Sequence, residues 1–537
     1  MSAPPDAALG PLARAVRAAY AAGEEDEAML PRVRVDSAGR PRGPIRAGDP
    51  VIFYDIRGER EIELSQALTD PRFPRFAAAG PVRLVTMIEY TPGLAERVAF
   101  PPEERLQDTL GEAVSRAGLF QVKVVESEKA VHLGYFLSGK REGIFPGEER
   151  RVIESLKDVK NYDERPEMRA AEVADQTIAA LQNPRWSLIV TNFANVDVVG
   201  HIENKPAVLQ AVAAVDRELG RVIAAARAAG VSVLLTADHG TVEQWLYPEG
   251  AVDTGHTRNP VPCLLLDPEL EAQGARLRPG GSLVDVAPTV LELLDLNKPA
   301  AMTGTSLIES RGEFKTRSYA ATRRRVLLLI ADGWGWREEA YGNLILEAKT
   351  PVMDRLRREH PFTTLLAAGE AVGLPPGTVG NSEAGHLHLG AGRVLYSDRL
   401  RIDRALLDGA FARNSAFLYA LEQSKKEDRP LHLLGIVSFF SSHGSLEHLF
   451  ALMHLAQAQG VKKMFIHSLL GRRGERPAAG AHYIAKVEAE CEKLGLGEVV
   501  TVMGRFWALD REQNWDRVEK AYRALVEGAG VLICPPA

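Results

Sequence analysis

The sequence has few cysteines, no long apolar run and no large excess of either charge. Its 537 residues include three cysteines, Cys263, Cys491 and Cys534, which lie far apart and form no pair with metal-binding spacing. This pattern is typical of a reducing compartment, so we expect a cytoplasmic protein. No apolar run approaches the ~18 residues needed to cross a bilayer, and the first residues do not resemble a signal peptide. We therefore expect no membrane association.

The charge balance indicates which kinds of binding partner to expect. The formal net charge is −6, which gives no electrostatic reason to expect binding to nucleic acid. Small anionic substrates remain compatible, because a local group of arginines can bind them within an acidic protein. The length exceeds that of one compact core and predicts two or three domains. We expect a monomer.

Strands and helices alternate along much of the chain, which predicts an α/β fold with parallel sheets. In such sheets ligands bind at the carboxyl ends of the strands. Residues 297–322 lack periodicity and are interpreted as a linker. The expected strands are 51–54, 82–88, 121–125, 131–137, 186–191, 231–236, 263–266, 326–330, 431–437, 463–467 and 499–503, and the expected helices are 9–20, 166–181, 205–229, 283–296 and 515–526.

Acidic and histidine side chains recur where predicted strands or glycine-rich turns end. One such residue alone is more often a helix cap or a surface side chain. Recurrence at four places favours a binuclear metal site, and the mixture of carboxylates and imidazoles suits Mn²⁺ or Zn²⁺. The candidate ligands are Asp332, the pair Asp238 and His239, the pair Asp197 and His201 with helical spacing, and His256.

The segment from Gly377 to His386 is a glycine-rich turn that leads into a possible helix. Backbone N–H groups in such a turn suit a phosphate group. A metal beside the Ser382 hydroxyl would lower its pKa and make it a nucleophile. Taken alone, the segment could equally be a loop with an ordinary serine. Beside the candidate ligands, it predicts that Ser382 is phosphorylated during catalysis.

Five motifs together resemble those of the cofactor-independent phosphoglycerate mutases, which belong to the alkaline phosphatase superfamily. The resemblance implies an α/β fold in which an alkaline-phosphatase-like parallel sheet domain is joined to a second α/β transferase domain. It also implies interconversion of 3-phosphoglycerate and 2-phosphoglycerate through a phosphoserine, with two divalent ions. Manganese is the expected ion, and magnesium, zinc or cobalt is also compatible. The motifs are Asp332-Gly-Trp-Gly, Gly380-Asn-Ser-Glu-Ala-Gly-His, Asn192 to His201, Thr236-Ala-Asp-His-Gly and His256-Thr-Arg-Asn-Pro.

The same resemblance implies a role for each site residue. Ser382, His443 and Lys129 would be catalytic. One metal ion would be bound by Asp332, Ser382, Asp238 and His239, and the other by Asp197, His201 and His256. A small-molecule phosphoglycerate would be bound by His443, Arg473, Arg505, Arg511, Arg57, Arg60 and Lys129, and arginine side chains suit its carboxylate and phosphate.

The order of the motifs differs from that of the family. Residues 1–310 resemble the family's later portion and residues 325–530 its earlier portion, which implies a circular permutation through the linker 297–322. The expected domains are a transferase-like domain formed by 1–103 and 398–537, and a phosphatase-like, metal-binding domain formed by 104–397.

One substrate-side motif departs from the family. Gly474 stands where the family has a carboxylate that is thought to handle the proton of the substrate hydroxyl. Proton transfer of this kind contributes about 10²–10⁴-fold to rate. Three outcomes stay open: Glu475 replaces the carboxylate, His443 acts alone, or the protein is mainly a metal-dependent phosphomonoesterase. A further alternative is an inactive binding or regulatory relative, against which the retained Ser382 and candidate ligands speak.

Overall fold

The computed structural model describes residues 9–102, 106–309, 324–438, 443–471 and 479–534. The chain divides into two compact units. Unit 1 comprises residues 1–102 and 401–537, and unit 2 comprises residues 103–400. These divisions lie within a few residues of the expected domain boundaries at 103 and 397, while the assignment of the units as transferase-like and phosphatase-like stays a prediction.

Unit 2 is built on an eight-stranded sheet with the order β11-β14-β9-β8-β13-β7-β5-β6. The central strand β13 pairs in parallel with both β7 and β8. Strand β9 is the exception to the expected parallel arrangement, because it runs antiparallel to β8 and β14. The strands are β5 (Phe120–Glu126), β6 (Glu148–Ile153), β7 (Trp186–Phe193), β8 (Ser232–Thr236), β9 (Val261–Leu266), β11 (Gly281–Ser282), β13 (Val326–Ala331) and β14 (Phe362–Leu366).

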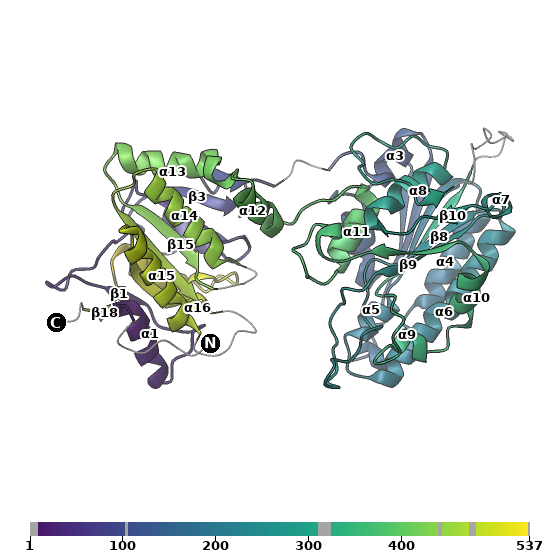
Figure 1. Ribbon diagram of the computed structural model, residues 1–537, viewed down its shortest axis with the longest axis horizontal. Helices are drawn as coiled ribbons and strands as arrows, with labels where there is room; N and C mark the ends of the chain where they lie inside the picture. The colour runs from purple at the N-terminus through teal and green to yellow at the C-terminus, as the bar shows by residue number, and fades with distance from the viewer. Residues whose placement is uncertain (1–8, 103–105, 310–323, 439–442, 472–478, 535–537) are drawn as a thin grey trace. The chain divides into compact units, whose positions relative to one another are not determined.

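Helices cover both faces of this sheet. In Figure 1, α4, α6 and α10 lie on one side of the strands, and α3, α8 and α11 lie on the other. Strand β13 is therefore buried along its whole length, as an all-apolar central strand requires. The helices are α3 (Leu110–Arg116), α4 (Ala170–Gln182), α5 (Asn195–Gly200), α6 (Lys205–Ala228), α8 (Val286–Leu293), α10 (Pro351–Glu359) and α11 (Ser382–Ala391), and a two-stranded sheet pairs β10 (Arg276–Leu277) with β12 (Ile308–Glu309).

Unit 1 contains a second eight-stranded sheet, with the order β18-β1-β17-β16-β15-β2-β3-β4. Its strands come from both parts of the sequence, and all neighbours are parallel except β1 and β17. The strands are β1 (Arg32–Arg34), β2 (Pro50–Phe53), β3 (Arg83–Ile88), β4 (Arg97–Phe100), β15 (Leu431–Ile436), β16 (Met464–Leu470), β17 (Glu498–Gly504) and β18 (Val531–Ile533).

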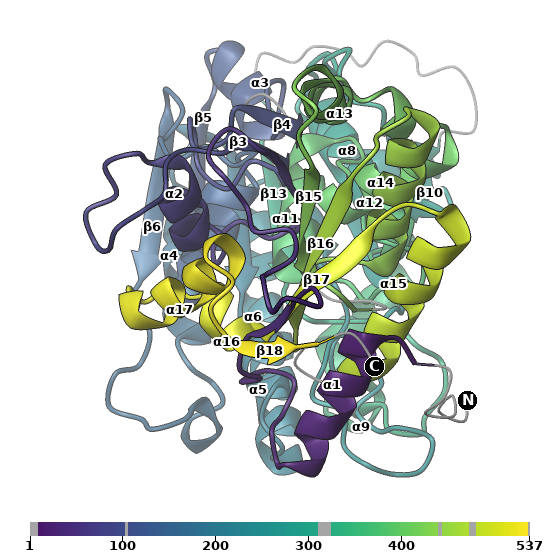
Figure 2. The ribbon, with the colours of Figure 1, turned by 90° about the vertical axis from the view of Figure 1, so that its left-hand side faces the viewer.

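The helices of unit 1 also lie on both sides of their sheet. Figure 2 shows α14 and α15 beside strands β15 to β17 on one side, and α2 and α17 on the other. The apolar segment near the end of the chain forms β18, which pairs with β1. The helices are α1 (Pro11–Ala21), α2 (Ile62–Thr69), α12 (Asp398–Leu407), α13 (Ser415–Lys426), α14 (Leu446–Ala458), α15 (Gly480–Leu494), α16 (Arg505–Ala508) and α17 (Trp515–Val526).

One predicted strand is wrong. Residues 131–137 do not form a strand, because His132–Phe136 is a π-helix that follows a short 3₁₀ turn, Ser127–Lys129. Leu133 and Leu137 are buried four residues apart while Val131 is exposed, so burial follows a helical period rather than the alternation of a strand. The turn that ends β5 places Lys129 at the carboxyl edge of the sheet.

Candidate functional site

The carboxyl ends of three neighbouring strands carry the predicted metal ligands. Asp332 directly follows β13, and Asp238 and His239 follow β8 by two and three residues. Asp197 lies on α5, just after β7. Because β13 pairs in parallel with both other strands, residues far apart in sequence meet at one edge of the sheet.

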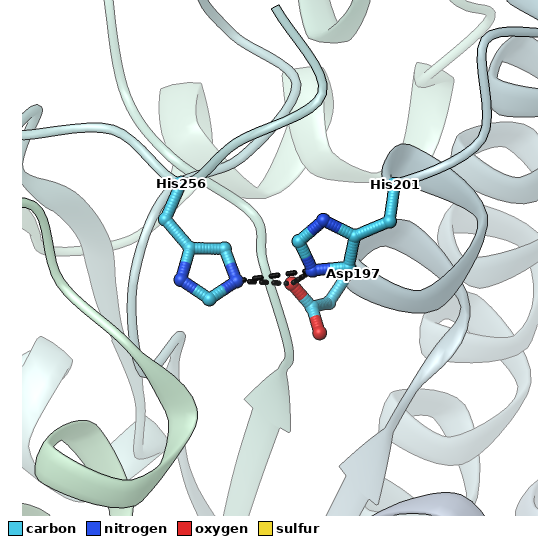
Figure 3. Close-up of side chains that lie close together, drawn as sticks. All are labelled: Asp197, His201 and His256. Carbon is cyan, nitrogen blue, oxygen red and sulfur yellow. Dashed lines mark hydrogen bonds and ion pairs between the residues drawn. The ribbon is translucent and has the colours of Figure 1, made fainter. Parts of the chain in front are cut away.

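Two histidines and one aspartate form the first part of the centre (Figure 3). The Nε2 atoms of His201 and His256 lie 3.1 Å apart. They lie 3.3 and 3.2 Å, respectively, from Oδ1 of Asp197. Both rings are turned by hydrogen bonds from Nδ1 to backbone carbonyls, of Thr254 at 2.7 Å and of Gly380 at 2.9 Å.

These contacts fix the tautomer of both rings. A carbonyl oxygen only accepts, so each Nδ1 carries a hydrogen and each neutral Nε2 has a lone pair. Two lone pairs and a carboxylate oxygen therefore converge on one point. A cation is the group that suits such a point, and a neutral histidine held through its other nitrogen is a common metal ligand.

Ser382 is the first residue of α11 and is buried. Its Oγ lies 2.9 Å from Nε2 of His239 and 2.6 Å from Nζ of Lys129. The preceding residue, Asn381, caps the helix by accepting a hydrogen bond of 2.8 Å from the amide of Ala384. This cap holds the first turn of α11, and with it the serine, at the edge of the sheet.

A glycine lets α11 approach that edge closely. A Cβ atom at Gly385 would lie 2.5 Å from the carbonyl oxygen of Asp238, closer than real Cβ contacts. Any larger residue would push the helix away from β8. The glycine in the Ser382 motif thus has a packing role, which brings the serine and Asp238 into one site.

Lys129 lies among the candidate metal ligands. Its Nζ donates to Oδ2 of Asp197 at 2.7 Å and to Oδ1 of Asp332 at 2.6 Å, in addition to Ser382. Burial alone would lower the pKa of Lys129, but the charges of Asp332, Asp197 and Asp238 outweigh it and raise the pKa above its usual value. The lysine is therefore charged and neutralises part of the carboxylate cluster.

Three further side chains orient the carboxylates, and no role was predicted for them from the sequence. His386 places Nδ1 3.2 Å from Oδ2 of Asp238, Asn192 donates to Asp332 at 2.7 Å, and Thr241 donates to Asp197 at 3.2 Å. His386 and Asn192 were visible as members of the motifs around Ser382 and Asp197. Their positions beside the ligands depend on the pairing of β7, β8 and β13, which the motifs do not specify.

The donor set fits divalent metal ions. Within each of three overlapping groups, the possible ligand atoms lie within 4.8 Å of one another. Buried carboxylates mixed with imidazoles suit Mn²⁺ or Zn²⁺. The predicted assignment of the seven ligands to two separate ions stays a prediction. The groups are Asp197, His201 and His256; Asp197, His239 and Asp332; and Asp238, Asp332 and His386.

The predicted substrate-binding residues, apart from Lys129, belong to unit 1. Arg57 and Arg511 both contact Glu59, at 3.4 and 3.1 Å. Arg505 is buried and contacts Glu27 at 3.2 Å, and Arg60 donates to the carbonyl of Leu509 at 3.2 Å. Arg473 lies outside the described residues, as do Gly474 and Glu475.

His443 shares this neighbourhood in unit 1. Burial lowers the pKa of its imidazole to about 4. The charge of Asp55 opposes this shift, and the positive charges of Arg505, Arg57 and Arg60 add to it. The histidine is therefore neutral near pH 7 and lies within electrostatic reach of three of the predicted substrate-binding arginines.

Comparison with known proteins identifies two matching family models. The model described as the Metalloenzyme superfamily matches residues 19–298. The model described as the BPG-independent PGAM N-terminus matches residues 402–533. The first match covers just over half of the chain. No helix in the described ranges is long and apolar enough to cross a membrane.

Curated relatives match at a similar level. The chain is 43% identical over 319 residues to the 2,3-bisphosphoglycerate-independent phosphoglycerate mutase of Chloroflexus aggregans, covering 55% of this chain and 59% of that protein. It is 42% identical over 310 residues to the protein of the same name from Thermomicrobium roseum, covering 56% and 59%. The chain thus spans about three-fifths of the length of these relatives. A solved structure titled as phosphoglycerate mutase of Leishmania mexicana at low cobalt concentration matches with 27% identity and a TM-score of 0.38, covering 51% of this chain and 53% of that one.

Proposed function

We propose, because this chain belongs to the Metalloenzyme superfamily, that it is a cofactor-independent phosphoglycerate mutase. The proposed reaction interconverts 3-phosphoglycerate and 2-phosphoglycerate. The observation that carries the proposal is the position of Ser382, whose hydroxyl is buried beside His239 and Lys129 within a set of carboxylate and imidazole ligands. The names of the relatives at 42–43% identity support the same reaction.

In this proposal Ser382 is the nucleophile. Its oxygen loses the hydroxyl proton and forms a bond to the phosphorus of the substrate, while the bond to the substrate oxygen breaks and that oxygen takes up a proton. The products are a phosphoserine and a glycerate hydroxyl. Two divalent ions, manganese in the first instance, would lower the pKa of the hydroxyl and offset the phosphoryl charge when bound. Lys129 adds a fixed positive charge beside the same oxygen.

The ligand assignment proposed from the motifs is compatible with the contacts. Asp332, Asp238, His239 and Ser382 would hold one ion, and Asp197, His201 and His256 the other. The facing Nε2 atoms of His201 and His256 support the second set most directly. Hydrogen bonds from Thr241 and Asn192 to the carboxylates would fix the ligands before an ion binds.

Binding of the glycerate group is proposed for unit 1. Arg57, Arg60, Arg505 and Arg511 offer guanidinium groups that suit a carboxylate or phosphate, and Arg473 is proposed from its motif. His443 would touch the substrate hydroxyl. We also propose that the protein acts in the cytoplasm as a monomer on this small molecule, without nucleic acid or membrane as partner.

We propose further that the sequence is circularly permuted relative to the family. The model described as an N-terminus matches residues 402–533, after the Metalloenzyme match at 19–298. Segment 297–322 would join the ends of the unpermuted order. The location of β13 between β7 and β8, which precede it in the chain, is compatible with such a rearrangement.

Product analysis tests the proposal. The manganese-loaded protein is incubated with 3-phosphoglycerate, and 2-phosphoglycerate and free phosphate are measured. We expect 2-phosphoglycerate, and we expect Ser382→Ala to lose this activity by about 10⁴-fold or more. Free phosphate as the sole product would instead identify a phosphomonoesterase, and no product would favour an inactive relative.

A matched serine variant controls for loss of a buried hydroxyl. Ser424 is also buried, and its Oγ donates to the carbonyl of Arg429 at 2.7 Å in unit 1. Ser424→Ala is expected to keep the activity. An equal loss in both variants would show that the effect of Ser382→Ala is structural.

A further inference from the structure

A buried carboxyl group in unit 2, that of Glu243, lies where three loops with candidate metal ligands meet, and no role was predicted for it from the sequence. Glu243 is fully buried in the loop after β8, which also carries Asp238 and His239. The second loop carries His256, and the third follows β13 and begins with Asp332. One side chain therefore contacts all three loops.

The carboxyl group of Glu243 accepts hydrogen bonds at both of its oxygens. Oε2 accepts one of 2.9 Å from the backbone amide of Thr241. Oε1 accepts from the hydroxyl of Thr257 and, at 3.0 Å, from the side-chain amide of Asn259. Among the described residues these partners are uncharged, and Glu243 forms no ion pair. A carboxylate accepts at both oxygens and donates at neither, so it suits a position that three donors face.

Two glycines leave the space that this carboxyl group fills. A Cβ atom at Gly240 would lie 2.3 Å from Oε1 of Glu243, and one at Gly335 would lie 2.2 Å from Oε2. Gly240 belongs to the motif that follows β8, and Gly335 belongs to the motif that follows β13. Both loops thus pack directly on the carboxyl group, as close packing in a protein interior requires.

The first route from Glu243 to a metal ligand passes through Thr257, which directly follows His256. The hydroxyl of Thr257 donates to Glu243. Its backbone amide donates to the carbonyl of Gly240 at 3.0 Å, and its carbonyl accepts from the amide of Gly380 at 3.1 Å. The carbonyl of Gly380 in turn accepts from Nδ1 of His256 at 2.9 Å. Glu243 therefore fixes a residue whose backbone positions His256.

The second route passes through Thr241. Its amide donates to Glu243, and its hydroxyl donates to Oδ1 of Asp197 at 3.2 Å. The same Oδ1 atom faces the Nε2 atoms of His201 and His256. Both routes therefore end at one set of converging ligand atoms, which we call the two-histidine group and which consists of Asp197, His201 and His256.

We propose that Glu243 is a positioning residue of the metal centre, which holds the two-histidine group in its ligand arrangement before an ion binds. This inference rests on the proposed metal-dependent function. Glu243 acts through Thr241 and Thr257, and in this proposal it contacts neither the ion nor the substrate. Residues that orient metal ligands typically contribute about 10–100-fold to metal affinity or activity.

Calorimetric titration of the full-length, metal-depleted protein with Mn²⁺ tests the role of Glu243. Glu243→Gln keeps the size of the side chain but replaces one accepting oxygen with an amino group, which then faces a donor. We expect the Kd of one manganese ion to rise about 10–100-fold, with the number of ions at saturation unchanged. Manganese binding equal to that of the unmodified protein would overturn the inference.

Asp216→Asn is the matched control. Asp216 is also buried in unit 2, and its carboxylate accepts from the backbone amides of Val352 at 3.0 Å and Met353 at 2.8 Å, at the start of α10. We expect its Kd for Mn²⁺ to stay within about threefold of that of the unmodified protein. An equal rise in both variants would show a general packing defect and would overturn the inference.

A double variant tests the route through Thr257. Thr257→Val keeps the shape of the side chain and removes the hydroxyl, so we expect it to raise the Kd about tenfold. Because Glu243 acts through this hydroxyl, Glu243→Gln combined with Thr257→Val should bind Mn²⁺ within about threefold of Glu243→Gln alone. No rise in Thr257→Val, or a loss in the double variant equal to the product of the two single losses, would overturn the inference.

Turnover separates this inference from the proposed function. At saturating Mn²⁺ the ions restore the ligand arrangement, so we expect the interconversion rate of Glu243→Gln to return to within about tenfold of the unmodified rate. A larger loss at saturation would overturn the inference. The expected change in Kd without any interconversion in the unmodified protein would support the inference and contradict the mutase function. Interconversion with equal manganese affinity in all variants would do the reverse.

Discussion

Both units bury a group of carboxyl side chains, but the side chains that accompany these carboxyl groups differ between the units. Unit 2 buries Asp197, Asp238 and Asp332 together with one lysine and several imidazole nitrogens. Unit 1 buries Asp55 and Glu61 with one histidine and no ion pair to a lysine or arginine among its described residues. The first group has lone pairs in excess around a shared centre and suits metal ions. The second lacks a lysine or arginine partner among the described residues, and burial raises the pKa of both of its carboxyl groups.

The comparison shows that residue type alone does not decide between the two kinds of site. Aspartate and histidine occur in both, and in both a histidine is turned by an acceptor at Nδ1. In unit 2 that acceptor is a backbone carbonyl, which leaves the carboxylate free to face a cation. In unit 1 the partner of Nδ1 is the side chain of Glu61, at 2.8 Å.

Removal of metal ions should have the largest effect on activity. An unchanged activity would contradict the interpretation of the unit 2 group as a metal site. We expect a chelator to lower the interconversion rate by about 10⁴-fold or more, with recovery on addition of Mn²⁺. His256→Ala removes one converging lone pair and should lower the number of bound ions by one, measured by elemental analysis. His360→Ala, in which a histidine beside Glu271 is lost from the same unit, should keep the full number.

The charge of Lys129 should matter less than the metal ions. Lys129→Met removes the ammonium group beside Ser382, so we expect kcat to fall about 10²-fold. Affinity for Mn²⁺, measured by calorimetry, should stay equal or rise, because the carboxylates lose a competing positive charge. Lys123→Met is the matched control, since Lys123 is also buried in unit 2 but contacts Ser138 and Glu148. A similar kcat in both variants would contradict the role of Lys129.

The buried carboxyl group of Glu61 in unit 1 predicts a pH dependence of stability. Glu61 has a folded-state pKa of about 8, above its ordinary value of 4.5, so the folded protein binds more protons than the unfolded chain between these values. The free energy of unfolding should therefore fall as pH rises through this window, by about 1–3 kcal/mol. Glu61→Gln should flatten the fall, measured by urea unfolding at several pH values. Glu422→Gln, at an exposed site beside Lys426, should leave the slope unchanged.

A helix cap in unit 1 should give the smallest effect. Asn414 accepts a hydrogen bond of 3.0 Å from the amide of Ala416 at the start of α13 and donates one of 2.7 Å to the carbonyl of Ala99. Asn414→Ala should lower the free energy of unfolding by about 1 kcal/mol, measured in urea, with unchanged kcat. A loss of activity at native stability would show that α13 takes part in the reaction.

The sequence predicted a strand or helix correctly where a long apolar segment or a clear apolar period marked it. Strand β13 and helix α17 lie where the apolar patterns predicted them, at 326–330 and 515–526. The segment 131–137 was misassigned, because its apolar residues suit either period and only its packing, mainly on α11, decides between them. Strand β14 was missed, since its residues Phe362–Leu366 are few and its role depends on pairing with β9.

The metal-ligand group of unit 2 was predictable from the sequence, whereas the group around His443 was not. The ligands of unit 2 follow strands, so the parallel pairing of β7, β13 and β8 suffices to explain why they meet. The group around His443 follows this rule only in part: Asp55 lies just after β2, and His443 lies in the segment after β15, which pairs in parallel with β2. Asp55 and Glu61 come from the first part of the chain and His443 from the last, and only the fold of unit 1 brings them together. The only sequence feature that indicated this group was a pair of acidic residues near Arg57 and Arg60. Such residues are equally typical of a solvated surface.

The pairing of β1 with β17 and β18 affects the order in which the two units can fold during synthesis. A ribosome completes residues 103–400 while the first hundred residues still lack β15, β16 and β17 as neighbours. Unit 2 can therefore close during translation, whereas the apolar strands β2 and β3 must wait for the last part of the chain. During that interval the earliest-made segment is the one that a chaperone would hold.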